Sequence, residues 1–350
     1  MRVRFETAMG TLEDREGVIV EIVDADGGRG IGEASPLPEL GAGRAADVLA
    51  LLERGGAALL AGDAGVALGA APGAQALRCA LDVAALDREA RRRGVPLSGL
   101  LAEEPAPWVA ANAVIGGGPP GEVVRHGLEA LHAGYSVLKL KVGMGPLGDD
   151  VRRIEALRTA CPEATIRLDA NGAWDEATAI RAIAAFYPYR IELLEQPVPG
   201  DAIDALARVR HDAPLRIAAD ESVQHEHSRD QVIERRAADL LVLKPMLLGG
   251  LRPALDIARR AADRGIGAFV TTTYDSSIGI AAALHLAAAL TSDAAHGLGT
   301  GEHLGRDVVA QTLLPRAGRL ALPAAPGLGV DYDNDALDAV ATGPWREAHV

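Results

Sequence analysis

The sequence predicts an α/β protein, a (β/α)8-type barrel that carries a smaller α+β capping domain. The main observation is a regular alternation of short apolar runs and amphipathic segments from residue 106 onward. Eight apolar runs start roughly 23 to 30 residues apart, enough for a strand, a helix and two short loops. A hairpin pattern and two long helical patterns precede these runs and predict the capping domain.

The first domain is expected to span residues 1–105. Apolar segments at 17–23 and 29–34 flank the sequence DADGG, whose Asp and Gly residues suit a tight β-hairpin turn. The segment 35–43 is rich in Pro and Gly and is expected to form a loop. Apolar residues then recur at helical spacing over 44–60 and 74–93. The order of these elements predicts an α+β domain.

The barrel is expected to span residues 106–318. An open doubly wound sheet is the alternative, but no predicted strand is followed by a Gly-rich dinucleotide-binding fingerprint. Residues 319–350 show no strand and helix alternation, and we expect them to return to the capping domain. The eight predicted strands start at Trp108, Tyr135, Thr165, Ile191, Leu215, Ala238, Gly267 and His296.

Composition excludes several classes of partner. The formal charge of -13 argues against nucleic acid or an anionic membrane, since both need a concentrated basic surface. The only two cysteines, Cys79 and Cys161, lie far apart without metal-type spacing, so a reduced cytoplasmic protein is expected. Neither a signal peptide nor an apolar run of about 18 residues is present, so we expect no export and no membrane span. Homo-oligomer formation stays open.

The run VLKLKVG, residues 137–143, places Lys139 and Lys141 two residues apart on a predicted strand. Side chains at positions i and i+2 point to the same face, so both ammonium groups are expected to face a site. Adjacent like charges lower each other's pKa, which is one way to obtain a neutral amine base. The alternative is a pair of surface lysines on a half-exposed strand.

Acidic residues end the next three predicted strands, namely Asp169, Glu195 and Asp220, and Lys244 ends the sixth. Active sites of such barrels gather at the C-terminal ends of the strands. Three neighbouring carboxylates repel each other unless a cation lies between them, although a salt bridge would explain any one of them singly. Oxygen ligands without His or Cys predict a hard divalent ion, Mg²⁺, with Mn²⁺ as a substitute.

These motifs together resemble the enolase superfamily, in its muconate-lactonizing subgroup. The resemblance rests on LKLKVG, RLDANGAW, LLEQPV, AADES and LVLKPMLLGG, and it covers nearly the whole chain. It implies a Mg²⁺-dependent enzyme that removes a proton next to the carboxylate of a small molecule. The implied roles are metal ligand for Asp169, Glu195 and Asp220, acid/base for Lys141 and Lys244, electrostatic partner for Lys139, and support of the ligands for Asn171 and Glu221.

Within that subgroup, GIGEASPLPEL, LKPMLLGG, TTTYDSSIGIAAALHLAAAL and PGLGVDYDN most resemble the o-succinylbenzoate synthase family. The resemblance implies a syn dehydration of 2-succinyl-6-hydroxy-2,4-cyclohexadiene-1-carboxylate. Lys141 would remove the α-proton and protonate the departing hydroxyl, while Lys244 would stabilise the enediolate as a cation. Ser276 and Ser277, just before a predicted helix, are expected to bind the succinyl carboxylate, with an ordinary helix N-cap as the alternative.

Three other functions stay open at this point. Lysines on opposite faces also suit the 1,1-proton transfer of N-succinylamino acid racemases and dipeptide epimerases. The D-x-D pattern that dipeptide epimerases commonly have at strand eight is not evident in GLGTGEHLG, residues 297–305. A non-catalytic barrel that binds a small carboxylate is disfavoured because both lysines and all three carboxylates are retained.

Overall fold

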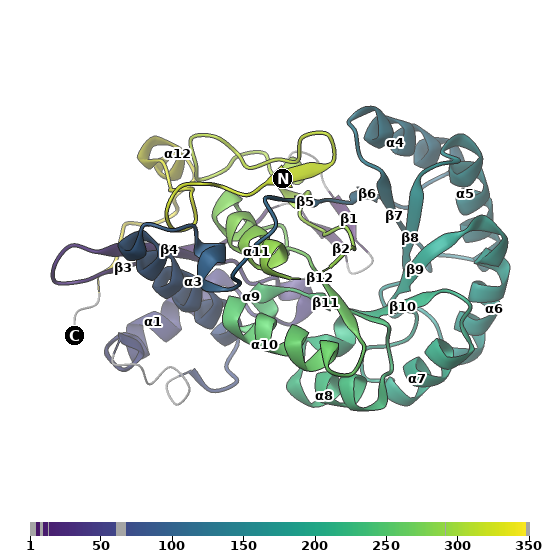
Figure 1. The fold of residues 1–350 in the computed structure, drawn as a ribbon, viewed down its shortest axis with the longest axis horizontal. Coiled ribbons are helices and arrows are strands. Elements are labelled where there is room, and N and C mark those ends of the chain that lie inside the picture. Colours follow the sequence, from purple (N-terminus) through teal and green to yellow (C-terminus); the bar gives the residue numbers. More distant parts are fainter. Residues whose placement is uncertain (1–4, 8–9, 13, 61–67, 291, 348–350) are drawn as a thin grey trace.

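The computed structural model describes residues 5–7, 10–12, 14–60, 68–290 and 292–347. Figure 1 shows the capping elements beside a curved wall of parallel strands that is covered on its outside by helices. The predicted α/β class, with a barrel and an N-terminal capping domain, is therefore confirmed. No helix within the described residues is long and apolar enough to cross a membrane.

The capping domain contains the predicted hairpin. Strands β3 (Val18–Val23) and β4 (Arg29–Ala34) pair antiparallel, and β1 (Phe5–Thr7) pairs with β2 (Gly10–Leu12). Helices α1 (Ala45–Leu60) and α3 (Ala74–Arg93) follow, close to the predicted bounds. Gly32 explains how closely α3 lies on β4, because a Cβ there would stand 2.0 Å from the carbonyl oxygen of Ala80.

Seven parallel strands form the barrel wall in the order in which they occur along the chain. Strand β7 (Val137–Lys141) pairs with its neighbour on each side, and the isolated bridges Thr271↔Gly297 and Ala111↔His296 close the wall. The other six strands of the wall are β6 (Ala113–Ile115), β8 (Thr165–Asp169), β9 (Ile191–Glu195), β10 (Arg216–Ala219), β11 (Leu240–Leu243) and β12 (Gly267–Val270).

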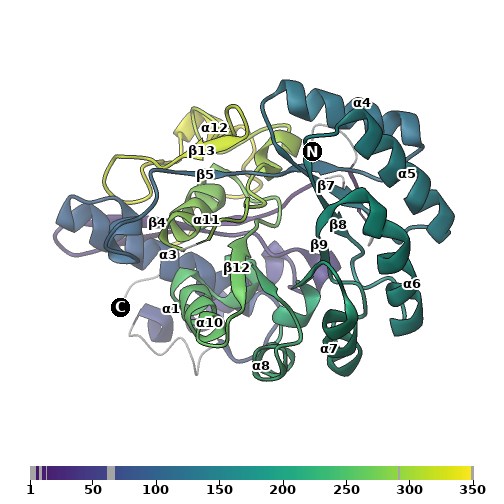
Figure 2. The ribbon, with the colours of Figure 1, turned by 45° about the vertical axis from the view of Figure 1, so that its right-hand side comes forward.

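Helices alternate with these strands and form the outer layer of the barrel, as Figure 2 also shows from a second direction. Helix α11 is buried along nearly its whole length and lies between the barrel and the capping domain. In chain order the helices are α4 (Pro120–His132), α5 (Leu147–Ala160), α6 (Glu176–Phe186), α7 (Ile203–Asp212), α8 (Glu226–Arg235), α9 (Pro245–Leu248), α10 (Leu251–Ala262) and α11 (Ser277–Ala289).

Two predicted strands differ from expectation. The segment that starts at Trp108 divides into β5 (Trp108–Ala110), which pairs with β13 (Arg319–Ala321), and β6, which enters the barrel. The chain changes partner between them, because the N–H of Ala111 bonds to Gly318 and that of Asn112 bonds to His296. The eighth predicted strand, at His296, is reduced to isolated bridges.

The C-terminal segment contacts the capping domain, as the yellow ribbon in Figure 1 shows. The buried carboxylate of Asp87 in α3 accepts hydrogen bonds from the N–H groups of Ile31 and Leu328 and from Arg91. One side chain thereby joins the hairpin, the helix and the tail. The short helix α12 (Asn334–Asp338) follows. The domain boundaries at residues 105 and 318 stay a prediction.

Candidate active site

The chain has three lysines, and all of them lie in or directly after barrel strands. Lys141 and Lys244 lie at the C-terminal ends of their strands, and Lys139 lies one turn of the pleat earlier, in the middle of its strand. Lys139 and Lys141 are in β7, and Lys244 directly follows β11. Every other basic side chain is an arginine or a histidine. All the side-chain primary amines of the protein therefore lie in this region of the barrel. Strands β8, β9 and β10 lie between the two groups of lysines in the wall.

The three predicted acidic residues lie on those intervening strands. Strand pairing sets Lys141 beside Asp169 and Asp169 beside Glu195, while Asp220 immediately follows β10. All three side chains are at most 3% exposed. Parallel pairing brings their carboxylates to one end of the barrel, as the spacing of the strands predicted.

Each carboxylate is bound by a lysine. The ammonium groups of Lys139 and Lys141 lie 2.9 and 2.6 Å from the same Asp169 oxygen, so their side chains do share one face. Lys139 also donates to Oε1 of Glu195 at 2.6 Å. On the other side, Lys244 donates to Oδ2 of Asp220 at 2.6 Å. Cations thus flank the carboxylates from both ends of the row.

The protein alone raises the pKa of Lys139 and that of Lys244, whereas a lowered pKa was expected for Lys139. Burial lowers the pKa of Lys139, but the nearby charges of Asp169 and Glu195 outweigh this effect and raise it. The pKa of Lys244 is also raised, since Asp220 and Glu221 outweigh its burial. Two like charges alone would lower the pKa of Lys139, but the neighbouring carboxylates have the larger effect in the folded chain.

The same site is short of positive charge. Burial, with the charge of Asp169, raises the pKa of Glu195 to about 8. Oε2 of Glu195 and Oδ1 of Asp220 are buried without a hydrogen-bond partner. A buried oxygen without a partner is costly, and hard divalent ions prefer oxygen ligands. The donor set therefore fits Mg²⁺, although no three His, Cys, Asp or Glu side chains of the described residues converge as a preformed cluster.

Asn171 and Glu221 connect the two ends of this row. The N–H of Asn171 donates to Asp169, and its side-chain oxygen accepts from Lys141 at 2.7 Å. Its amide nitrogen donates to Glu221 at 3.1 Å. Asn171 has a φ of 45°, a left-handed conformation that Asn tolerates better than most residues. The loop after β8 is therefore shaped to support Asp169 and Lys141.

The structure gives Ser276 and Ser277 different partners from the expected substrate. Ser276 is the N-cap of α11, and both its N–H and its hydroxyl donate to the carboxylate of Glu33. The hydroxyl of Ser277 donates to Asp307. Protein carboxylates therefore occupy this helix N-terminus, which corresponds to the N-cap alternative rather than to a carboxylate-binding site.

One supporting residue lies outside the predicted set. Gln196 follows Glu195 with a φ of 38°, and its side-chain oxygen accepts from the N–H groups of Asp220 and Ser222. It therefore fixes the backbone that presents Asp220. Its place directly after a predicted ligand was the available signal in the sequence.

Fold and site together define a capped barrel enzyme whose lysines and carboxylates meet at the strand ends. Residues 122–336 match the family model described as enolase C-terminal domain-like. Residues 1–102 match that of the mandelate racemase and muconate lactonizing enzyme N-terminal domain. The chain belongs to the enolase superfamily, and it is an enzyme of the muconate-lactonizing subgroup.

Its relatives carry out different reactions. Muconate cycloisomerase 1 of Rhodococcus opacus is 32% identical over 74% of this chain and 70% of that protein. The o-succinylbenzoate synthase of Thermobifida fusca is 37% identical over 69% of this chain and 75% of that protein. A dipeptide epimerase from Enterococcus faecalis, solved with Mg and the dipeptide L-Leu-L-Tyr, matches with a TM-score of 0.86 and 29% identity over 94% and 95% of the two chains. Membership of the family therefore leaves the substrate open.

Proposed function

We propose that Asp169, Glu195 and Asp220 hold Mg²⁺ and that the chain dehydrates 2-succinyl-6-hydroxy-2,4-cyclohexadiene-1-carboxylate to 2-succinylbenzoate. When bound, Mg²⁺ supplies positive charge that makes the proton next to a substrate carboxylate more acidic. The buried oxygens of Glu195 and Asp220 that have no partner support the metal assignment. Mn²⁺ is the substitute with the same preference for oxygen ligands.

In this proposal Lys141 moves the proton. Its ammonium is held by Asp169 and Asn171, so its position is fixed on one side of the row of carboxylates. As a neutral amine it takes the α-proton, and as an ammonium it then protonates the hydroxyl that leaves from the same face of the ring. Lys139 and Lys244 remain charged and stabilise the negative charge that develops on the substrate.

The identity of 37% to the o-succinylbenzoate synthase of Thermobifida fusca is the observation that carries the choice of substrate. The segments around residues 31–40 and 271–290 point to the same family by resemblance. The syn reaction requires only one proton-transferring lysine, which suits the two hydrogen bonds that hold Lys141. A reduced cytoplasmic setting and the oligomeric state stay predictions.

Racemisation or epimerisation is the second candidate. Lysines bound to carboxylates on both sides of the row suit removal of a proton from one face and its return to the other. The match to the Enterococcus faecalis epimerase, over 94% of this chain, supports this function. The absence of a D-x-D pattern in residues 297–305 argues against the dipeptide reaction.

Proton NMR in D₂O separates these candidates. The protein is incubated with Mg²⁺ and either the hydroxycyclohexadiene substrate or an N-succinylamino acid. The proposal expects aromatic product signals from the first and little deuterium at the α-carbon of the second. Rapid α-deuteration without any dehydration would reject the lyase proposal in favour of the racemase. No reaction with either substrate, together with no Mg²⁺ binding by calorimetry, would support a non-catalytic barrel.

A further inference from the structure

The motif LKPMLLGG, residues 243–250, joins Lys244 to helix α10 through a tightly wound backbone. The carbonyl oxygen of Lys244 accepts from the N–H of Leu248 at 3.1 Å. The carbonyl oxygen of Pro245 then accepts from the N–H of Gly250 at 3.0 Å. Because the connection is short and internally hydrogen-bonded, a displacement at the start of α10 also displaces the backbone of Lys244.

Asp82 of helix α3 caps α10 from the other domain. Gly250 is the N-cap residue of α10, and it has no side chain that could accept from the first N–H groups of the helix. Instead, Oδ2 of Asp82 accepts from the N–H groups of Leu251 and Arg252 at 2.8 and 3.1 Å. These N–H groups have no acceptor within their own helix, and Asp is among the best capping residues. A residue 169 positions away therefore supplies the cap.

Gly250 allows α3 to come this close. Its φ of 135° is one that residues with a Cβ rarely adopt, and a Cβ there would stand 2.5 Å from Oδ2 of Asp82. A side chain at this position would therefore displace the capping carboxylate. The glycine that ends the motif is the point at which α3 meets the barrel backbone.

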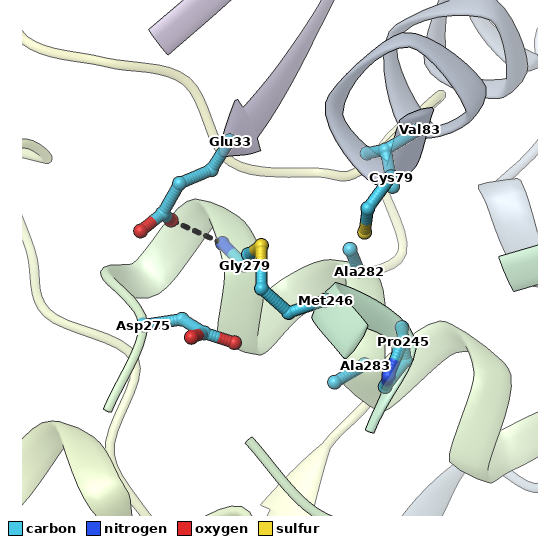
Figure 3. A pocket seen from close by; sticks show the side chains of 9 residues that line it. All are labelled: Glu33, Cys79, Val83, Pro245, Met246, Asp275, Gly279, Ala282 and Ala283. Atoms are coloured by element: carbon cyan, nitrogen blue, oxygen red, sulfur yellow. Dashed lines mark hydrogen bonds between the residues drawn. The ribbon is translucent and has the colours of Figure 1, made fainter. Parts of the chain in front are cut away.

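A second contact holds the same turn from the side of the hairpin. The sulfur of Met246, which is buried, accepts from the N–H of Ser35 at 3.2 Å. Figure 3 shows Met246 extending from α9 toward Glu33, with Cys79 of α3 opposite. Glu33 in turn accepts from the N–H of Gly279 in α11 at 2.9 Å, which is the dashed line in the figure. The capping domain therefore holds the turn both at α9 and at the start of α10.

We propose that Asp82 is a positioning residue, which holds Lys244 in place by capping α10 from the capping domain. The ammonium of Lys244 donates to Oδ2 of Asp220 at 2.6 Å. A long, flexible side chain is placed only as precisely as its backbone is held, so the cap contributes to this contact. The kinetic part of this inference rests on the proposed function, in which Lys244 stabilises negative charge, whereas the structural part does not.

The three lysines of the chain provide a direct test. Protein that contains ¹³C-labelled lysine should give three sets of side-chain NMR signals, which Lys→Arg variants assign. In Asp82→Ala the signals of Lys244 should move. Those of Lys139 and Lys141 should stay in place, because three strands separate β7 from β11 in the wall. Asp82→Asn should keep the wild-type signals of Lys244, since the Asn side-chain oxygen can still accept from both N–H groups.

Arg252→Gln is the matched control. The guanidinium of Arg252 lies 3.0 Å from Oδ1 of Asp82, and its side chain is 55% exposed. This variant removes the ion pair and keeps the cap, so the Lys244 signals should not move and kcat should stay within about twofold of the wild type. A shift of the Lys244 signals as large as that in Asp82→Ala would mean that the ion pair acts rather than the cap, and it would overturn the proposal.

Turnover is measured on the same variants. Asp82→Ala should lower kcat about 10- to 100-fold with little change in KM, because small misplacements near the chemistry are costly and the charge that Lys244 stabilises develops only during the reaction. Asp82→Asn should restore most of this loss. Wild-type Lys244 signals in Asp82→Ala, or an equal loss of kcat in Asp82→Asn, would contradict the positioning role.

Two further comparisons keep the test decisive. If Asp82→Ala does not fold, Gly250→Ala replaces it, because the added Cβ forces the carboxylate of Asp82 off the cap; unchanged Lys244 signals there would reject the proposal. If the wild type does not dehydrate the diene, turnover is replaced by α-deuteration of an N-succinylamino acid. The NMR comparison needs no substrate, so a failure of the proposed function and a failure of this inference are distinguishable.

Discussion

Lys141→Ala removes the amine that we propose moves the proton, and it should abolish turnover while Mg²⁺ binding persists. General acid and base catalysis typically contributes 10² to 10⁴-fold, so a residue that acts in both steps should cost about 10⁴-fold or more. Asp169 keeps its contact with Lys139 at 2.9 Å, so the acidic row remains partly neutralised. The side-chain oxygen of Asn171 loses a donor, which should cost about 1–3 kcal/mol of unfolding free energy.

Three measurements check this prediction. Ultraviolet absorbance follows dehydration, calorimetry follows Mg²⁺ binding, and urea denaturation followed by circular dichroism gives the unfolding free energy. Arg208→Ala, which removes an exposed ion pair with Glu176, is the control for a general effect of losing a cation. Dehydration by Lys141→Ala within about tenfold of the wild-type rate would remove Lys141 from the base role.

Three other substitutions test the site and the barrel. Asp220→Asn should weaken Mg²⁺ binding at least about tenfold by calorimetry, whereas Asp212→Asn, at an exposed position, should not weaken it. Equal Mg²⁺ affinities of Asp220→Asn and the wild type would reject the assignment of Asp220 as a ligand. Arg167→Met removes a buried guanidinium that pairs with the partly exposed Glu192 and donates to the carbonyl oxygen of Ala295. It should lower the unfolding free energy by about 1–3 kcal/mol in urea, because Glu192 keeps its pair with Arg216, and an unchanged midpoint would contradict this. Burial lowers the pKa of His296 to about 4, below its unfolded value, so the unfolding free energy should fall as the pH drops from about 6.5 toward 4. His296→Gln should lose about 3 kcal/mol less of its unfolding free energy than the wild type over this range. Identical pH profiles of the two proteins would refute this prediction.

Local patterns in the sequence predicted most of the backbone. The turn DADGG and its flanking strands correspond to β3 and β4, and the helical periodicity at 74–93 corresponds to α3. Local reasoning also predicted that the three lysines and the three acidic residues lie together, because side-chain direction alternates along a strand and parallel strands end at one face. Such rules need only a few neighbouring residues.

What the sequence did not predict depends on contacts between distant residues. Glu33 binds the N-terminus of α11 across 243 positions, so the partner of Ser276 in the structure is a carboxylate of the β3–β4 hairpin. Arg15 contacts Thr273 across 258 positions, and its donors go to backbone carbonyls that carry no sequence signal. The raised pKa of Lys139 likewise arises from carboxylates on other strands.

The most direct test of the proposed function is an ultraviolet assay of the purified protein with 2-succinyl-6-hydroxy-2,4-cyclohexadiene-1-carboxylate and Mg²⁺. Loss of the diene absorbance is followed with and without a chelator, and the control reaction contains Lys141→Ala. The proposal predicts rapid conversion by the wild type, which the chelator stops and the variant lacks. Failure of the metal-loaded wild type to convert the diene, with α-deuteration of an N-succinylamino acid intact, would contradict the lyase function.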